Sequence, residues 1–332
     1  MKWYFINKKK INKFFRMSGG IRMQPKLLIK GSIDRILALL KALIVCDFPV
    51  TIRVDDNEQI RSAVLSSKMC HNLSIQIADK PELNNFDALL YLPDIEFYNP
   101  KLTDANQIAE DMRPEIDNLR DVINDCVSNG FRGKIIINAP HDEIFAYFAA
   151  GFSGLNNQNI IGVGTLPQEM LLKNELLRNF DVSADDINVN VLGLNTNNLV
   201  AWSRVYIGPA TLLSYLADDS NNYSSDIIGQ VQQVIDDPDV VTNQMIQSKA
   251  LIRLLISMYE GQSLICSVVS VDKEKDELKL DMSPKLINRN GAAQAIRLQL
   301  SEDEQKKLNQ DLGWANEIIT AVINGGKDAS KN

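Results

Sequence analysis

The sequence predicts an α/β fold in its first part and an α+β fold in its second. From Pro25 to about Ala149, strand-like apolar runs alternate with helix-like segments, as in a doubly wound parallel sheet. Beyond that point, short strand-like runs are separated by polar turns such as DKEKD and NRNG, which favour antiparallel strands. A chain of 332 residues with 45% hydrophobic content is long enough to form both domains.

The first 23 residues form a basic leader that differs from the rest of the chain. It holds seven of the 35 basic residues and no acidic one: Lys2, Lys8, Lys9, Lys10, Lys13, Arg16 and Arg22. It lacks a continuous apolar core and a small-residue cleavage site, so it does not resemble a secretory signal. We expect a disordered tail, or an overlong gene model with the true start at Met17 or Met23; the alternative is a basic arm for a partner or a membrane surface. A second polar tail is expected at residues 326–332.

Charge and cysteine content exclude several classes of function. The chain beyond the leader carries 28 basic against 42 acidic residues, which gives it no general attraction for nucleic acid or anionic lipid. Its longest apolar segment, residues 36–45, is interrupted by Lys41 and is too short for a membrane span. The four cysteines form no CxxC pair, which argues against disulfides and a metal site: Cys46, Cys70, Cys126 and Cys266. We expect no metal and a cytoplasmic location.

The first elements are a strand (LLIKG), an apolar helix and a second strand (VTIRV). This order is typical of the opening of a dinucleotide-binding βαβ unit. Gly31 stands at the end of the first strand, and Asp55 or Asp56 is placed to meet an adenosine ribose. These positions are the candidate cofactor contacts.

The glycine fingerprint of such a unit is altered in this chain. Starting at Gly31, the pattern GxGxxG becomes GSIDRI, with Ile33 and Ile36 in place of the second and third glycines. A β-branched residue crowds the pyrophosphate and the helix-strand contact, and it resists positive φ. Asp34 adds a negative charge beside the phosphates. The sequence therefore predicts weakened NAD binding.

The middle of the first domain contains two further predicted strands and a helix. Residues 86–92 (FDALLYL) form the first strand, and a segment with Lys101 as its one cation follows. We expect a helix over residues 115–127, with Arg113 as a solvated residue beside Pro114 in its first turn. The buried strand KIIINAP ends at Asn138.

The stretch from Ile161 to Ser203 carries the most specific pattern. It reads IGVGTLPQEMLLKNELL, then a polar turn region, then NVLGLNTNNLVAWS. This frame resembles the lactate/malate dehydrogenase family, in which GxGTxLDxxR is followed by a GxHG segment and a WS pair. The matching residues are Gly162, Gly164, Thr165, Gly193, Trp202 and Ser203. The resemblance covers about residues 25–323.

The resemblance implies a Rossmann-type NAD-binding domain at residues 24–149 and a lactate/malate dehydrogenase C-terminal-like domain at residues 150–325. It also implies NAD as cofactor, a 2-hydroxyacid or 2-keto acid as substrate, and a site between the domains. Subunits of this family assemble through large apolar faces.

The family's catalytic positions have lost their chemistry in this chain. The catalytic Asp falls on Gln168, the substrate-binding Arg on Leu171 and the catalytic His on Asn195. An amide at position 195 cannot titrate, and a leucine cannot hold a carboxylate as a bidentate arginine does. The lid arginine falls near Ala109, where no charge is available.

Other candidate site residues depend on the same resemblance. Asn138 stands where the family places an amide near nicotinamide and substrate, although the spacing to EIFAY at residues 143–147 also allows Pro140. Thr242 stands near a pocket threonine, and His141 is the one histidine near the expected pocket. His141 is a weak alternative catalytic residue.

The second half completes the pattern. We expect strands at SADDINVNVLGL and VAWSRVYIG, a surface loop at ADDSNNYSSD and a helix over residues 242–259. Strands LICSVVSV, ELKLDM and AIRLQL then precede a last amphipathic helix, in which Ser301 and Glu304 form a capping box.

The leading hypothesis is a catalytically inactive paralogue, or pseudoenzyme, that acts by binding. Its expected partner is another copy of itself or a related dehydrogenase subunit. The alternative is an active NAD-dependent oxidoreductase (L-lactate/malate or a related 2-hydroxyacid dehydrogenase) with an altered site that uses His141, Lys101, Asn138 or Gln168. A third possibility is that the catalytic frame is misaligned and ordinary dehydrogenase activity persists.

Overall fold

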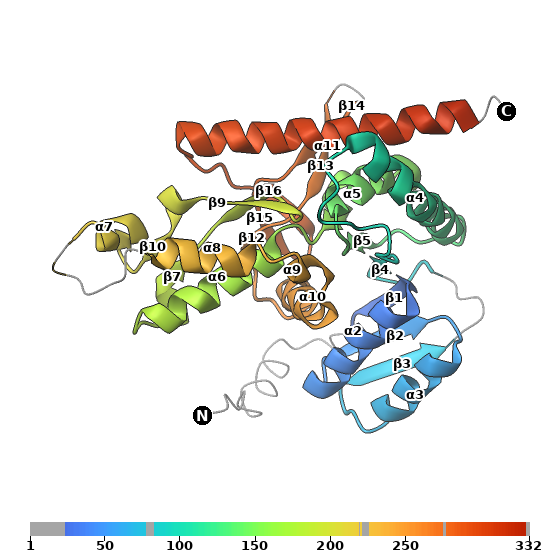
Figure 1. The fold of residues 1–332 in the computed structure, drawn as a ribbon. Coiled ribbons are helices and arrows are strands. Elements are labelled where there is room, and N and C mark those ends of the chain that lie inside the picture. Colours follow the sequence, from blue (N-terminus) through green and yellow to red (C-terminus); the bar gives the residue numbers. More distant parts are fainter. Residues whose placement is uncertain (1–23, 78–82, 219, 221–225, 275–276, 330–332) are drawn as a thin grey trace.

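The structure is a computed structural model that describes residues 24–77, 83–218, 220, 226–274 and 277–329 (Figure 1). The predicted leader at residues 1–23 lies outside the described residues. The same holds for most of the predicted surface loop at residues 217–226 and for the last three residues of the predicted tail.

The predicted doubly wound parallel sheet is confirmed. Six parallel strands lie in the order β3-β2-β1-β4-β5-β6. The strand order reverses between β1 and β4, which places a topological switch point at the carboxyl ends of these two strands. The strands are β1 (Lys26–Gly31), β2 (Val50–Val54), β3 (Leu73–Ile77), β4 (Ala88–Leu92), β5 (Lys134–Ile137) and β6 (Ile160–Gly162).

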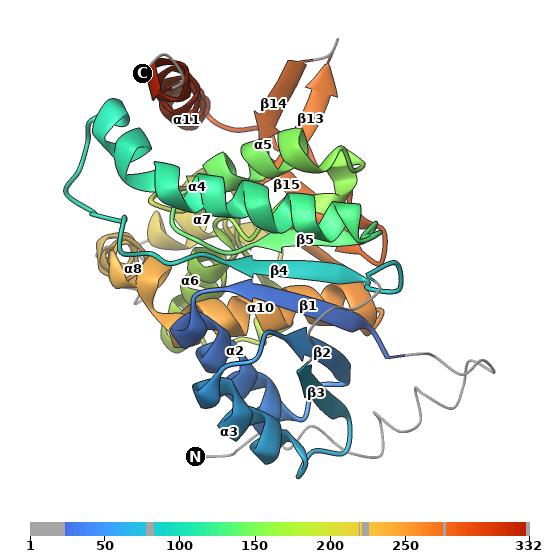
Figure 2. The ribbon, with the colours of Figure 1, turned by 90° about the vertical axis from the view of Figure 1, so that its right-hand side faces the viewer.

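Helices cover both faces of this sheet, as Figure 2 shows for the layers above and below β1 and β4. One apolar core lies between the sheet and three helices: α2 (Ile33–Cys46), α3 (Glu58–Ser67) and α10 (Gln244–Tyr259). The second core lies on the opposite face, under α4 (Ala105–Ser128), α5 (Asp142–Ser153) and α11 (Glu302–Ala329). The helix α11 runs across the outer side of α4 and α5 (Figure 1).

The prediction that a helix begins near Pro114 is wrong. The helix α4 starts nine residues earlier, because the Asp104 carboxylate accepts hydrogen bonds from the N–H groups of Asn106 and Gln107. Pro114 lies inside the helix, where it leaves one carbonyl of the preceding turn without its usual backbone donor.

Arg113 is also not the solvated residue that the sequence suggested. Its Nε atom is buried, and its guanidinium lies over Gly325 of α11. A Cβ at Gly325 would come within 1.7 Å of the Arg113 Nη2 atom. The glycine therefore allows α4 and α11 to pack closely at this point.

The second half forms small antiparallel sheets, as predicted. The hairpin of β8 (Val191–Leu194) and β9 (Asn197–Val200) is separate from the sheet of β7 (Ile187–Asn188), β10 (Tyr206–Ile207) and β11 (Ala210–Thr211). A 3₁₀ turn at Trp202–Arg204 interrupts the single strand predicted for VAWSRVYIG.

The last strands differ from prediction in number and bounds. The segment LICSVVSV is split into β12 (Leu264–Ser267) and β13 (Ser270–Glu274), because Val269 bonds to Gly162 at the edge of the parallel sheet. The strand β14 (Glu277–Asp281) was predicted, whereas β15 (Pro284–Asn288) and β16 (Gly291–Ala295) were not. The turn predicted at NRNG joins the latter two, and most of AIRLQL lies outside strands.

The remaining helices are α6 (Leu166–Asn179), α7 (Leu212–Leu216), α8 (Ile227–Ile235) and α9 (Asp239–Thr242). Asn243 caps α10 through its side chain and separates it from α9, so the long helix predicted from Thr242 starts two residues later. The predicted capping box of α11 is confirmed, because the Ser301 N–H donates to Glu304 and the Glu304 N–H donates to the Ser301 hydroxyl. Within the described part of the chain, no helix is long and apolar enough to cross a membrane.

Candidate functional site

The switch point of the parallel sheet is occupied by a buried arginine. Arg35 lies in the first turn of α2, and its guanidinium reaches the carboxyl ends of β4 and β5. Its Nη1 atom donates to the carbonyls of Pro93 (3.0 Å) and Asn138 (2.7 Å), and its Nη2 atom donates to Asn138 Oδ1 (2.6 Å). Burial lowers the pKa of Arg35 from 12.5 to about 10, while Asp94 and Asp142 oppose this change. Arg35 is therefore still a cation at neutral pH.

Asn138 extends this network toward α10. Its Nδ2 atom donates to Gln247 Oε1 (2.6 Å), and the Gln247 amide donates to the Val240 carbonyl (2.6 Å). The cavity beside these side chains has a volume of only about 10 Å³. One water molecule needs about that much space.

The predicted adenosine end of a cofactor site is engaged by local contacts. Asp55 follows β2 as expected, but both its carboxylate oxygens accept hydrogen bonds from Lys30 Nζ, at 2.6 and 2.8 Å. Asp56 forms an exposed ion pair with Arg61 at 2.5 Å. Gly31 has φ 129°, and a Cβ there would lie 1.9 Å from the Leu92 carbonyl oxygen. This glycine is thus required for the contact between β1 and β4 whether or not a cofactor binds.

The structure brings together Gln168 and Asn195, on which the resemblance places the family's catalytic Asp and His. Gln168 is buried at the start of α6, and its Nε2 atom donates to the Asn195 carbonyl (2.7 Å). The Asn195 side chain in turn accepts from the His141 N–H (3.0 Å) and donates to the Ala139 carbonyl (2.7 Å). Both amides therefore join the turn between β8 and β9 to neighbouring segments, and neither can donate a proton to a substrate.

The other predicted site residues do not converge on this pair. Leu171 packs against an apolar cluster that contains Leu172 and Phe180, and Ala109 is buried in the second core within α4. Lys101 is exposed in a turn, and Thr242 is the partly buried last residue of α9. Leu171 and Ala109 carry no group that could bind a substrate carboxylate.

His141 has a strained and buried position. It has φ 56°, which is uncommon for a residue other than glycine. Its Nδ1 atom lies 3.2 Å from Glu143 Oε1 and 3.4 Å from the Thr196 hydroxyl. The ring of Tyr98 meets the imidazole edge-on, with 6.0 Å between centroids. The sequence located His141 but did not indicate that the adjacent acids are buried.

Asp142 lies against two glycines of the family frame. Its Oδ2 atom accepts a hydrogen bond from the Gly164 N–H (2.7 Å), and a Cβ at Gly162 would lie 3.0 Å from its Cγ atom. Burial raises the pKa of Asp142 well above its usual value, and the nearby Glu143 acts in the same direction. These glycines accommodate a buried acid and the backbone of residues 267–269.

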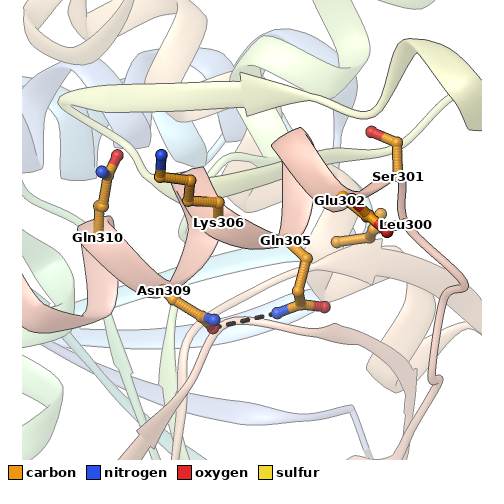
Figure 3. A pocket seen from close by; sticks show the side chains of 7 residues that line it. All are labelled: Leu300, Ser301, Glu302, Gln305, Lys306, Asn309 and Gln310. Atoms are coloured by element: carbon orange, nitrogen blue, oxygen red, sulfur yellow. Dashed lines mark hydrogen bonds between the residues drawn. The ribbon is translucent and has the colours of Figure 1, made fainter.

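Within the described residues, no three metal-binding side chains are grouped so as to hold an ion. A cavity of about 690 Å³ lies elsewhere, and all its lining residues belong to the start of α11 or to the two residues before it (Figure 3). It is a hollow on the outer side of one helix, away from the switch point.

Comparisons with known proteins agree with this architecture. L-lactate dehydrogenase of Oceanobacillus iheyensis is 26% identical over 211 residues, covering 58% of this chain and 63% of that protein. L-lactate dehydrogenase 2 of Lactococcus lactis subsp. lactis is 22% identical over 212 residues, covering 61% and 68% respectively. The match thus spans less than two thirds of the first of these relatives, and no protein-family model matches the sequence.

Solved structures show the same fold over most of the chain. A lactate dehydrogenase from a Medee basin deep-sea metagenome library has a TM-score of 0.75 at 16% identity, covering 90% of this chain and 99% of that one. The ligand-bound minor L-lactate dehydrogenase from Enterococcus mundtii has a TM-score of 0.73 at 15% identity, covering 90% and 98%. These sequence relatives and the shared fold support membership of the chain in the lactate/malate dehydrogenase family.

Proposed function

We propose that this protein is a catalytically inactive member of its family that acts by binding other protein subunits. The observation that carries the proposal is the network of Arg35, Asn138 and Gln247, which leaves a cavity of about 10 Å³ at the switch point. A dinucleotide binds in this crevice in Rossmann-type folds. The residues present do not fit NAD, because Arg35 fills the space that the cofactor needs.

The chemistry at the family's catalytic positions supports the same proposal. A positioned acid or base contributes about 10²- to 10⁴-fold to a proton-coupled reaction. Asn195 and Gln168 are amides whose hydrogen bonds are directed to backbone groups, and the Gln168 side chain donates to the backbone carbonyl of Asn195. With Leu171 in place of the substrate-binding arginine, a 2-keto acid would have neither a proton donor nor a carboxylate clamp.

Assembly with a second copy or with a related dehydrogenase subunit is the proposed mode of binding. Large apolar side chains are exposed around α2 and α3, including Val45 (88% exposed), Met69 (85%) and Leu65 (66%). Large apolar side chains that are exposed to solvent favour association between subunits. We place the protein in the cytoplasm, in keeping with its dehydrogenase relatives.

Calorimetric titration with NADH tests the proposal, with pyruvate and oxaloacetate turnover measured on the same preparation. We expect no binding at millimolar cofactor and no turnover. Binding without turnover would indicate a nucleotide sensor, and turnover would overturn the assignment of Asn195. A mass in solution equal to one chain, with no association with a dehydrogenase of the same cell, would count against subunit binding.

A second candidate function, an oxidoreductase with an altered site, is favoured by one observation. His141 and Glu143 form a buried histidine-carboxylate pair next to Asn195, in a strained backbone conformation. Such a pair can hold an imidazole in one tautomer for proton transfer. If turnover is found, it should be lost in His141→Ala; turnover that survives both His141→Ala and Lys101→Ala would remove these residues from the mechanism.

A further inference from the structure

The first half of α11 is held on the body by few contacts. Near its start, the Ser203 hydroxyl donates to Glu304 Oε2 at 2.6 Å. One turn later, Leu308 packs against a small apolar cluster on the hairpin of β8 and β9, which contains Leu192 and Leu199. The opposite side of this segment lines the open hollow of Figure 3. A segment with so few buried apolar contacts opens locally at low free-energy cost.

Asp311 is the buried charged group in this half of the helix. It is 4% exposed, and its Oδ1 atom accepts a hydrogen bond from Asn197 Nδ2 at 2.9 Å. Its Oδ2 atom lies over Gly193, where a Cβ would approach to 2.6 Å, and it accepts no hydrogen bond from any described residue. Gly193 therefore provides the space into which this carboxyl group fits.

A second buried carboxyl group, Glu143 of α5, acts electrostatically on Asp311. Glu143 is 0% exposed, and its Oε2 atom also lacks a hydrogen-bond donor among the described residues. A buried ionised oxygen without a donor is costly, and two such groups near each other cannot both stay ionised cheaply. Two partnerless carboxylate oxygens on opposing helices therefore indicate that a proton is held here.

The surrounding charges are unevenly distributed. Lys307 of α11 is the one cation that influences Asp311, and the side of α5 contributes His141, Asp142 and Glu143. The hairpin contributes the neutral side chains of Thr196 and Asn197. Burial raises the pKa of Asp311 from 3.8 to about 6, with Glu143 acting in the same direction and Lys307 and Asn197 opposing it.

We propose that Asp311 is a proton-dependent latch that holds the first half of α11 on the hairpin of β8 and β9. The helix stays docked when the Asp311 carboxyl is protonated. Ionisation leaves a charged Oδ2 atom without a hydrogen-bond donor in this buried position, and solvent then competes for the Asp311 carboxylate. Release of the helix exposes the hairpin whose turn carries Asn195.

The direction and size of the effect follow from proton linkage. The docked state binds the proton more tightly than the open state, in which the Asp311 carboxyl has its usual pKa. Opening therefore becomes more favourable as the pH rises from the usual pKa through the raised one. A single proton with these two values predicts a rise of at most about tenfold in the opening equilibrium between pH 5 and pH 7.5.

Hydrogen-deuterium exchange of the whole chain at these two pH values tests the proposal. After correction for the chemical exchange rate, opening of residues 302–313 should rise several-fold at the higher pH. Residues 314–325, which lie over α4 and α5, serve as the internal reference and should not change. An unchanged opening equilibrium in residues 302–313 of the unmodified protein would overturn the latch without any variant.

Two variants identify the carboxyl group whose ionisation opens the helix. Asp311→Asn keeps an acceptor for Asn197 but cannot ionise, so its opening should be the same at both pH values. Asp303→Asn makes the same chemical change at an exposed position of α11 and should keep the rise. If Asp311→Asn does not fold, Glu143→Gln should move the rise to lower pH by removing the neighbouring charge. The assignment of Asp311 as the titrating group would be refuted by either of two results. One is that opening of residues 302–313 in Asp311→Asn still rises with pH as in the wild type. The other is that the rise in Glu143→Gln occurs at the same pH as in the wild type.

Discussion

Replacing Arg35 with alanine is the sharpest test of how the switch point is closed. The wild-type guanidinium donates three hydrogen bonds of 2.6–3.0 Å to the carbonyls of Pro93 and Asn138 and to the Asn138 side chain. Hydrogen bonds that involve a charged group contribute about 1.5–3 kcal/mol each, so together they provide roughly 6 kcal/mol. The lowering of the Arg35 pKa to about 10 corresponds to a burial cost of about 3 kcal/mol, since one pKa unit equals about 1.4 kcal/mol.

The difference between the hydrogen-bond contribution and the burial cost predicts that Arg35→Ala lowers the free energy of unfolding by about 3 kcal/mol. Urea denaturation followed by circular dichroism measures this loss, with the slope against urea checked for a change in cooperativity. Arg61→Ala is the matched control, because it removes an arginine from an exposed ion pair with Asp56 and should cost less than about 1 kcal/mol. If Arg35→Ala is as stable as this control, Arg35 does not hold the crevice closed, and the argument against NAD binding loses its main support.

Three further predictions concern the site and the core. The double change Gln168→Asp with Asn195→His should restore no pyruvate-dependent NADH oxidation above background, because Arg35 still fills the cofactor space; measurable turnover would contradict the closed crevice. Gly325→Leu should stay within about 1 kcal/mol of the wild type in thermal or urea melts, because the colliding Arg113 guanidinium is the free end of a flexible side chain and leucine favours the helix over glycine. Ala321→Leu, on the partly buried neighbouring turn, provides the comparison, and a clearly larger loss in Gly325→Leu would show that the Arg113 guanidinium cannot move aside. Burial raises the pKa of Glu169 to about 8, so the protonated folded form is favoured and stability should fall as the pH rises from about 4.5 to about 8. Glu169→Gln should remove this fall, which is at most about 4 kcal/mol, and an unchanged pH profile would show that another group titrates.

The family frame was predictable from sequence because its signals are local. Gly162, Gly164 and Gly193 each meet a close contact that excludes a side chain, and the run from Ile161 to Ser203 preserves their spacing. The same frame placed the family's catalytic Asp on Gln168 and its catalytic His on Asn195, and a hydrogen bond of 2.7 Å joins these two residues. The parallel sheet was equally readable, since its strands are short apolar runs separated by helices.

What the sequence did not reveal depends on distant partners. Arg35 was passed over as one residue of an altered glycine fingerprint, whereas its partners Pro93 and Asn138 lie 58 and 103 residues further along the chain. The start of α4 was misplaced because Pro114 suggested a first turn, while the Asp104 cap begins the helix earlier and packing against α11 stabilises its interior. The hairpin of β15 and β16 was missed because Gly291–Ala295 contains small residues with little strand preference.

The closed switch point also limits how such a protein could regain an enzymatic role. A histidine restored at position 195 would face no cofactor, and glycines restored at positions 33 and 36 would still lie next to the Arg35 guanidinium. Removing Arg35 first would leave Asn138 without its donors and destabilise the fold before any activity appears. No single substitution along these routes brings a catalytic gain, so reversal requires several changes together. On the proposed function, the loss of the reaction is in this sense built into the hydrogen bonds that stabilise the chain.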